Sequence, residues 1–247
     1  MNALAGFDPV DAIAVALFLI AWLGHSYIVS RSPLRTRTLS YAMHAYRLRW
    51  MGNTVRRKVK IVDAAIQNGL QQGVLFFAST SILLIGALLA ALGAGEQAVR
   101  MLGDLPFTST DTRTEWEAKV LLAAGIFTYA FFKFAWSYRL FNYVIILIGA
   151  GPEEDNANPP PDEAQLDEWA TRVGRLHSIA GYHFTAGIHA YFHALSVTAW
   201  FVNGWAFIIA TVWVSIVLYR RAFGSRFLRI LTDRETDTDL SSPRTGG

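Results

Sequence analysis

Long apolar runs alternate with charged segments along the whole chain. The runs cover residues 10–29, 73–95, 120–150 and 176–219. A helix needs about 20 apolar residues to cross the hydrocarbon core of a bilayer, so each run is long enough to span it. The last run is too long for one span, and Asn203-Gly204 is a turn signal between two tryptophans. The pattern therefore predicts five transmembrane helices, at about 10–29, 73–95, 120–142, 178–201 and 205–219.

The charged segments orient these predicted helices. Residues 31–60 hold nine Lys or Arg and no acid, whereas the connection 96–119 holds five acids. Arginines follow the last span from Arg220 onward. Because loops rich in Lys and Arg stay on the cytoplasmic side, we expect the N-terminus outside and the C-terminus in the cytoplasm. A four-span arrangement would leave the C-terminal arginines outside, so the charges favour five spans.

The segments between the spans complete the predicted layout. We expect a single helical membrane domain over residues 1–232 and a flexible tail over 233–247. Residues 31–60 form a cytoplasmic basic segment, and residues 151–168 form an acidic linker in which three consecutive prolines exclude a helix. One helix is expected to start near Asp162 and another near Arg56. The expected fold class is an all-α integral membrane protein with about five spans and cytoplasmic helix extensions.

Composition supports this class and excludes several functions. Hydrophobic residues make up 53% of the chain, charged residues 17%, and the mean hydropathy is +0.29. The absence of cysteine excludes disulfides, thiolate metal sites and a cysteine nucleophile. No phosphate loop, dinucleotide fingerprint, nucleophile elbow or HExxH signature occurs, so no enzyme is predicted. The basic segment lies next to an apolar span, which favours cytoplasmic retention over nucleic-acid binding.

Three long stretches resemble a known family. They are IVDAAIQNGLQQGVLFFASTSILLIGALLAALG at 61–93, FTYAFFKFAWSYRLFNYVIILIGAGP at 127–152 and the histidine-containing run at 183–221. In this order they resemble the bacterial inner-membrane family catalogued as domain of unknown function 599. The most specific parts are NGLQQG with FFASTS, and FFKFAWSYRLFNY. The resemblance implies a multi-pass helical protein of the bacterial inner membrane, and it brings no activity, substrate or catalytic residue.

Basic side chains inside the predicted spans are the main functional candidates. Lys133 lies near mid-depth of the third span. His189 and His193 are four residues apart, so they share one helix face beside a stripe of alanines and should point into the protein. Arg139 and Asn142 lie closer to the cytoplasm. No acid occurs at mid-depth in any predicted span, so water, an anion or a lipid headgroup must compensate these basic groups.

These residues predict an oligomeric channel or transporter-like protein with a basic, anion-accepting cavity. Lys133, His189 and His193 would line the cavity and Gln71 and Gln72 would lie at its mouth. The alternative is a non-transporting scaffold or accessory subunit that binds anionic lipid, in which the histidines are structural. A third alternative is a redox protein holding haem or a metal through His189 and His193, although no cofactor is predicted.

The expected partners follow from the same features. We expect membrane lipids with anionic headgroups and no nucleic acid. Gly86, Ala90 and Ala94 form a stripe of small residues at steps of four, a surface on which helices pack closely in lipid. The stripe favours a homo-oligomer, and a membrane-protein partner is the other expectation.

Overall fold

The computed structural model describes residues 8–30, 32–103, 112–152 and 160–224, which are helical with no strand. The predicted tail 233–247 and residues 153–159 of the predicted linker lie outside the described residues. The α-helices are α1 (Pro9–Ser30), α2 (Leu39–Arg56), α3 (Ile61–Gly93), α4 (Gly95–Gly103), α5 (Arg113–Gly149), α6 (Glu163–Thr198) and α7 (Gly204–Phe223). Two short 3-10 helices, Pro33–Arg37 and Ala199–Phe201, precede α2 and α7.

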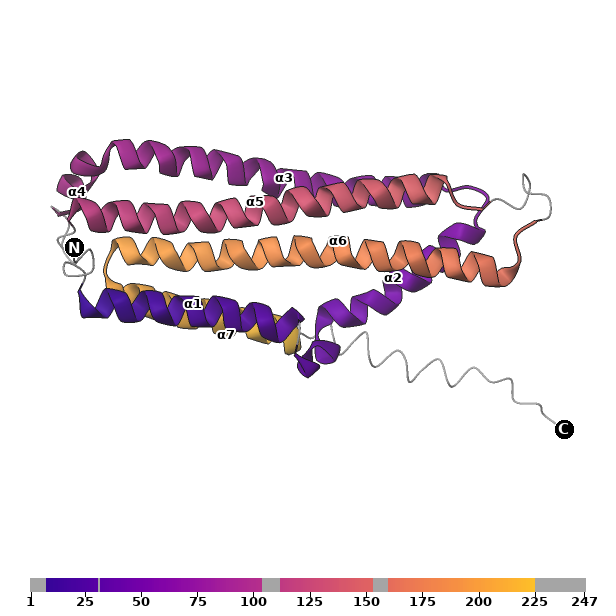
Figure 1. Cartoon of the computed structure of the whole chain (residues 1–247), viewed down its shortest axis with the longest axis horizontal. Coiled ribbons are helices and arrows are strands. Elements are labelled where there is room, and N and C mark those ends of the chain that lie inside the picture. Colours follow the sequence, from indigo (N-terminus) through magenta and orange to yellow (C-terminus); the bar gives the residue numbers. More distant parts are fainter. Residues whose placement is uncertain (1–7, 31, 104–111, 153–159, 225–247) are drawn as a thin grey trace, which may run out of the picture.

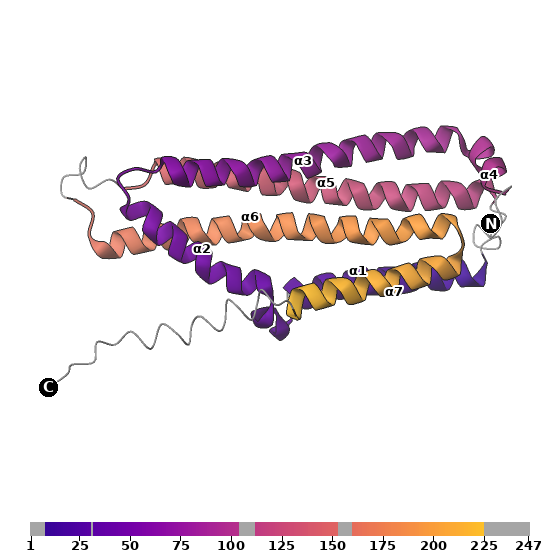
Figure 2. The same cartoon turned by 180° about the vertical axis from the view of Figure 1, so that it is seen from behind.

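The long helices lie in a flat bundle in which each packs on the next. Figure 1 shows α3, α5 and α6 side by side, with α1 and α7 paired along the free side of α6. Seen from behind, the order is the same, and α2 crosses α6 obliquely at one end (Figure 2). We call this end, formed by α2 with the start of α3, the end of α5 and the start of α6, the α2 end.

Helix length separates the α2 end from the rest. At about 1.5 Å per residue, α3, α5 and α6 are each roughly 50–55 Å long, whereas a bilayer core is about 30 Å thick. The 22-residue α1 and the 20-residue α7 match the core thickness. Figure 1 shows the three long helices continuing past α1 and α7 at the α2 end. The three long helices therefore extend past α1 and α7 at this end, and the expected cytoplasmic helix extensions stay a prediction.

Among the described residues, four helices are long and apolar enough to cross a membrane, namely α1, α3, α5 and α7. The chain is therefore an all-helical membrane protein. Helix α6 is not among the four, although it runs alongside α5 through the same part of the bundle (Figure 1). The predicted count of five spans stays a prediction.

Local capping chemistry explains where several helices begin. The Asp162 side chain accepts from the Gln165 backbone, and the Gln165 side chain accepts from the Asp162 backbone, so this capping box starts α6 where expected. Asn203 caps α7 by accepting from Ala206 N–H at 2.8 Å. The helix predicted to begin near Arg56 begins at Ile61 instead, because Arg57 adopts an extended conformation that ends α2.

The core of the bundle is aromatic and closely packed around α5. The rings of Phe77 and Phe134 stack 5.5 Å apart, and Phe184 and Tyr191 pack against both. A Cβ atom on Gly187 would lie 2.5 Å from the Phe134 ring. Glycine at this position therefore lets Phe134 of α5 pack directly against the backbone of α6.

Candidate functional site

A wide groove lies between α2 and α6. Its volume is about 770 Å³, within the range of small-ligand sites. The end of α1 closes one side through Val29, and Ile179 adds a second apolar wall. The polar lining carries basic and hydroxyl groups and no carboxylate: Thr38, Ser40, Tyr41, His44, Arg47, Arg175, Ser178 and Tyr182.

Arg47 is the central charge of this groove. Its guanidinium packs against α6 where Gly181 lacks a side chain, since a Cβ there would lie 2.7 Å from Nη2 of Arg47. The side chain is half-buried, and burial lowers the pKa of Arg47 from its usual value. Within the described chain no carboxylate forms an ion pair with Arg47. A partly desolvated cation without a counter-ion attracts an anion.

His44 and Ser178 fix the groove wall beside Arg47. Ser178 Oγ donates to the Gly174 carbonyl at 2.9 Å, and His44 Nδ1 lies 2.7 Å from the same hydroxyl. Because a hydroxyl has one proton to donate, His44 Nδ1 is the donor in the second bond. This contact joins α2 to α6 and holds the imidazole in one orientation at the edge of the groove.

Ion pairs join α2 to α6 beyond the groove. Arg56 Nη2 lies 2.6 Å from Glu163 and 2.5 Å from Asp167. Hydrogen bonds to Asp167 and then to Glu163 raise the pKa of Arg56. Both acids belong to the acidic segment 151–168, so the acidic and basic segments contact each other here. These two acids pair with Arg56 at the end of α2. Arg47, which lies earlier on the same helix, has no carboxylate partner among the described residues.

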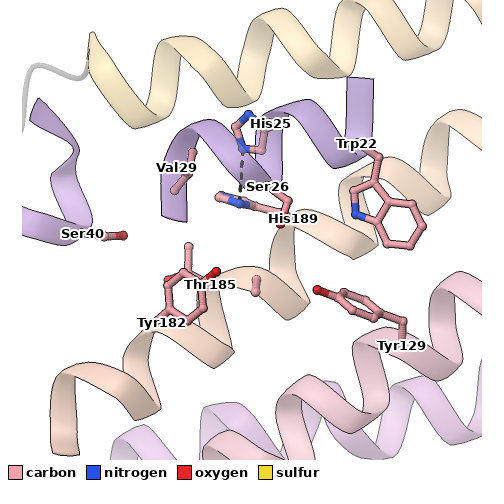
Figure 3. Close-up of a pocket in the computed structure, with 10 residues that line it drawn as sticks. Trp22, His25, Ser26, Val29, Ser40, Tyr129, Tyr182, Thr185 and His189 are labelled. Atoms are coloured by element: carbon pink, nitrogen blue, oxygen red, sulfur yellow. Dashed lines mark hydrogen bonds between the residues drawn. The ribbon is translucent and has the colours of Figure 1, made fainter. Parts of the chain in front are cut away.

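A small inner pocket adjoins the groove, because Val29, Ser40 and Tyr182 line both. Figure 3 shows His25 of α1 and His189 of α6 facing each other there, with Nε2 of His25 3.3 Å from Nδ1 of His189. The pocket holds about 20 Å³, roughly the space that one water needs. The pair is a second polar site, smaller and more enclosed than the groove.

The predicted cavity residues within the bundle do not share one cavity. His193 is fully buried, with its ring 5.9 Å from Phe18 and 6.2 Å from His25, and neither ring nitrogen has a partner among the described residues. Lys133 is half-buried, with Nζ 5.2 Å from the centre of the Tyr129 ring. Only His189 lines the inner pocket.

The other predicted site residues lie elsewhere. Gln71 is buried and donates to Asn142 Oδ1 at 2.7 Å, which joins α3 to α5. Gln72 is exposed on the outer side of α3. Arg139 is also exposed, and it donates to the hydroxyl of Tyr143 at 2.7 Å. The structure thus brings Gln71 and Asn142 together and separates them from Gln72 and Arg139.

Asp63 is a fully buried acid that the sequence did not mark as a site. Its Oδ1 accepts from Trp50 Nε1 at 2.6 Å, Thr54 Oγ1 at 3.0 Å and Arg57 Nη1 at 2.9 Å. The other carboxylate oxygen has no partner among the described residues. These bonds hold the start of α3 against the end of α2. The signal in the sequence is a lone acid that directly follows the basic segment 31–60.

Arg47 and its neighbours were missed for a similar reason. Retention on the cytoplasmic side depends on the number of basic residues in 31–60 and assigns no role to any single arginine. Arg47 lies about one turn before Met51, which is 2% exposed, so a charge next to the apolar face of α2 was the available signal. Sequence periodicity alone does not show that α6 covers this face.

The described histidines and acids do not assemble a metal centre. Within the described ranges, no three His, Asp or Glu side chains lie close enough to hold an ion. The haem or metal alternative requires His189 and His193 as the two ligands. In the structure the imidazole of His189 faces that of His25. His193 instead packs among the aromatic rings of Phe18 and Trp22.

Fold and site together define an all-helical membrane protein with a basic groove between α2 and the middle of α6, beside the end of α1. The family model described as protein of unknown function, DUF599, matches residues 13–227. The chain belongs to this family, as the resemblance implied. Neither the comparison with curated proteins nor that with solved structures gave a match.

Proposed function

We propose that this protein binds the headgroup of an anionic phospholipid in the groove between α2 and α6. The observation that carries the proposal is Arg47, a half-buried guanidinium that faces the groove and has no carboxylate partner among the described residues. Guanidinium and phosphate form paired, charge-assisted hydrogen bonds. A phosphate would therefore satisfy the group that the protein leaves uncompensated.

The position of the groove favours a lipid as the source of the phosphate. Helix α1 ends at Ser30, and Val29 in its last turn lines the groove together with Ser40 at the start of α2. The groove thus lies where the membrane-length helices end. Basic pockets at that depth on the cytoplasmic side recognise anionic headgroups. Val29 and Ile179 supply an apolar wall for the first carbons of the chains.

Transport of an anion is the second candidate, and the inner pocket favours it. The pocket shares Val29, Ser40 and Tyr182 with the groove and ends at the His25–His189 pair. An ion that enters the groove would meet these imidazoles next. The space of about 20 Å³ is the narrow point of such a route, so lipid binding is the better supported function.

The test compares Arg47→Gln with Arg172→Gln. Arg172 lies on α6, is exposed and pairs with Glu168 outside the groove, so it controls for the loss of one positive charge. We expect native mass spectrometry to find phosphatidylglycerol or cardiolipin retained by the wild type and by Arg172→Gln. Arg47→Gln should retain at least about tenfold less, in line with the loss of a charge-assisted pair.

Equal retention by both variants would refute the groove as the lipid site. Proteoliposomes made with the same proteins separate the two candidates. Chloride or phosphate flux that disappears in His189→Phe would favour transport, whereas lipid retention without flux would favour the binding protein.

A further inference from the structure

The outer face of α3 is exposed, uncharged and longer than a membrane is thick. Apart from Asp63, which is fully buried, the helix contains no charged residue between Ile61 and Gly93. Lipid covers an apolar helix only over the bilayer core of about 30 Å, and α3 is about 50 Å long. At the α2 end the helix exposes Ile61, Val62, Ile66 and Leu70, by 75, 61, 48 and 41%.

The centre of this face has the composition of a close helix contact. Six exposed residues follow one another at alternating steps of four and three, the register in which two parallel helices pack. We call them the α3 stripe: Ala65, Gly69, Gln72, Phe76, Ser79 and Leu83. Small residues continue on this side at Gly86 and Ala90. A Cβ on Gly69 or Gly86 would meet no atom within 4 Å, so no other helix of the monomer packs closely against the backbone at these two glycines.

Polar groups in the α3 stripe indicate what covers it. No described residue forms a hydrogen bond with the side chains of Gln72, Ser79 or the neighbouring Asn68. An amide both donates and accepts, so Gln72 is able to pair with an identical glutamine, which a charged side chain cannot do with its own copy. Copies that share one orientation in a membrane meet through a two-fold axis along the bilayer normal, which brings equivalent residues together.

We infer that α3 is the contact between two copies of this chain, which pack α3 against α3 in parallel along the α3 stripe. Gly69 and Gly86 allow the backbones to approach, as small residues do between membrane helices. Gln72 bonds to its counterpart, and Ile61 and Val62, which continue the register of the stripe at the α2 end, leave water. The groove is lined by α1, α2 and α6, so the contact and the proposed lipid site are independent.

Because the chain has no cysteine, single cysteines report this contact directly. Gln72→Cys and Leu83→Cys lie on the stripe. Ile66→Cys and Ile82→Cys are exposed controls beside it, each one residue, or about 100°, around the helix from a stripe position. A disulfide needs Cα atoms within about 7 Å. Oxidation in native membranes should give at least about tenfold more linked dimer for the stripe variants.

Equal linking at stripe and control positions, or none at Gln72→Cys and Leu83→Cys, would overturn the inference. A second measurement does not depend on disulfide geometry. Gly69→Ile with Gly86→Ile should convert the dimer seen by native mass spectrometry into monomer. The monomer's packing is unaffected because both positions face open space. A dimer that persists in this double variant, or a heterologous protein linked in its place, contradicts pairing between copies.

Discussion

The extensions of α3 and α6 at the α2 end have opposite patterns. The α6 extension exposes charges such as Glu163, Asp167 and Arg172 and buries Leu166 and Val173. The α3 extension buries Asp63, Gln67 and Gln71 and exposes isoleucine, valine and leucine. The first is the pattern of a soluble helix, and the second is that of a helix surrounded by apolar material. The exposed apolar side chains of the α3 extension are therefore unfavourable in contact with water, whereas the exposed charged side chains of the α6 extension are not.

The two extensions are also held by different forces. The α6 extension packs on α2 through Met51, Ala170 and Val173 and adds the ion pairs of Arg56. The α3 extension is joined to α2 by the single carboxylate of Asp63 and its three donors. The comparison can therefore be tested by removing one contact at a time from each extension.

The largest effect is expected from Asp63→Leu. Trp50 Nε1 would lose its acceptor, which costs about 1–3 kcal/mol, and Arg57 would lose its ion pair, whereas Thr54 Oγ1 keeps the Trp50 carbonyl at 2.9 Å. We expect a loss of about 3 kcal/mol in the free energy of unfolding, together with faster proteolysis at residues 57–60. Asp63→Asn keeps an acceptor oxygen and should restore more than half of the loss. A wild-type melting curve for Asp63→Leu would show that the carboxylate does not hold this extension.

Gly174→Ala tests the packing of the α6 extension. A Cβ there would lie 2.8 Å from Cδ2 and 3.1 Å from Cα of Leu48, so α2 must shift, at about 1–3 kcal/mol. The matched change Gly73→Ala on α3 meets no atom within 4 Å and should stabilise the helix by up to about 1 kcal/mol. Thermal unfolding in detergent should therefore move in opposite directions for the two variants. Shifts of the same sign would contradict the assigned packing.

The smallest effect is expected from Arg56→Gln. The pairs with Glu163 and Asp167 are on the surface, where water and salt screen them. We expect a decrease in Tm smaller than that of Gly174→Ala, and no difference from wild type in 1 M salt. A decrease that survives high salt would mean that Arg56 acts by packing and not by charge.

Features set by neighbouring residues could be predicted from the sequence. The turn at Asn203-Gly204 and the start of α6 at Asp162 depend on side chains that bond to nearby backbone, so both were expected. The long apolar runs likewise identified the membrane class. The predicted start near Arg56 was wrong because Arg57 turns back toward Asp63, a contact between helices.

Contacts between distant helices could not be predicted. Gln71 and Gln72 differ by about 100° around α3, so only one can face α5, and Asn142 on that helix selects Gln71. His25 and His189 meet because α1 is rotated to face α6, and periodicity within one helix carries no information on that rotation. The same holds for Arg47, which depends on where α2 crosses α6.

The pairing of α1 with α7 has a consequence for biosynthesis. Phe18 contacts Phe207 at 5.3 Å between ring centres, and Gly204 lies against Asp11, so α1 is completed by α7, a helix that is synthesised much later. Until α7 leaves the ribosome, the buried faces of Ala14 and Phe18 remain uncovered by α7. Both residues are apolar, and lipid solvates them during this wait. Assembly of the bundle can therefore close late, by lateral docking of α7 within the membrane, without exposing these residues to water.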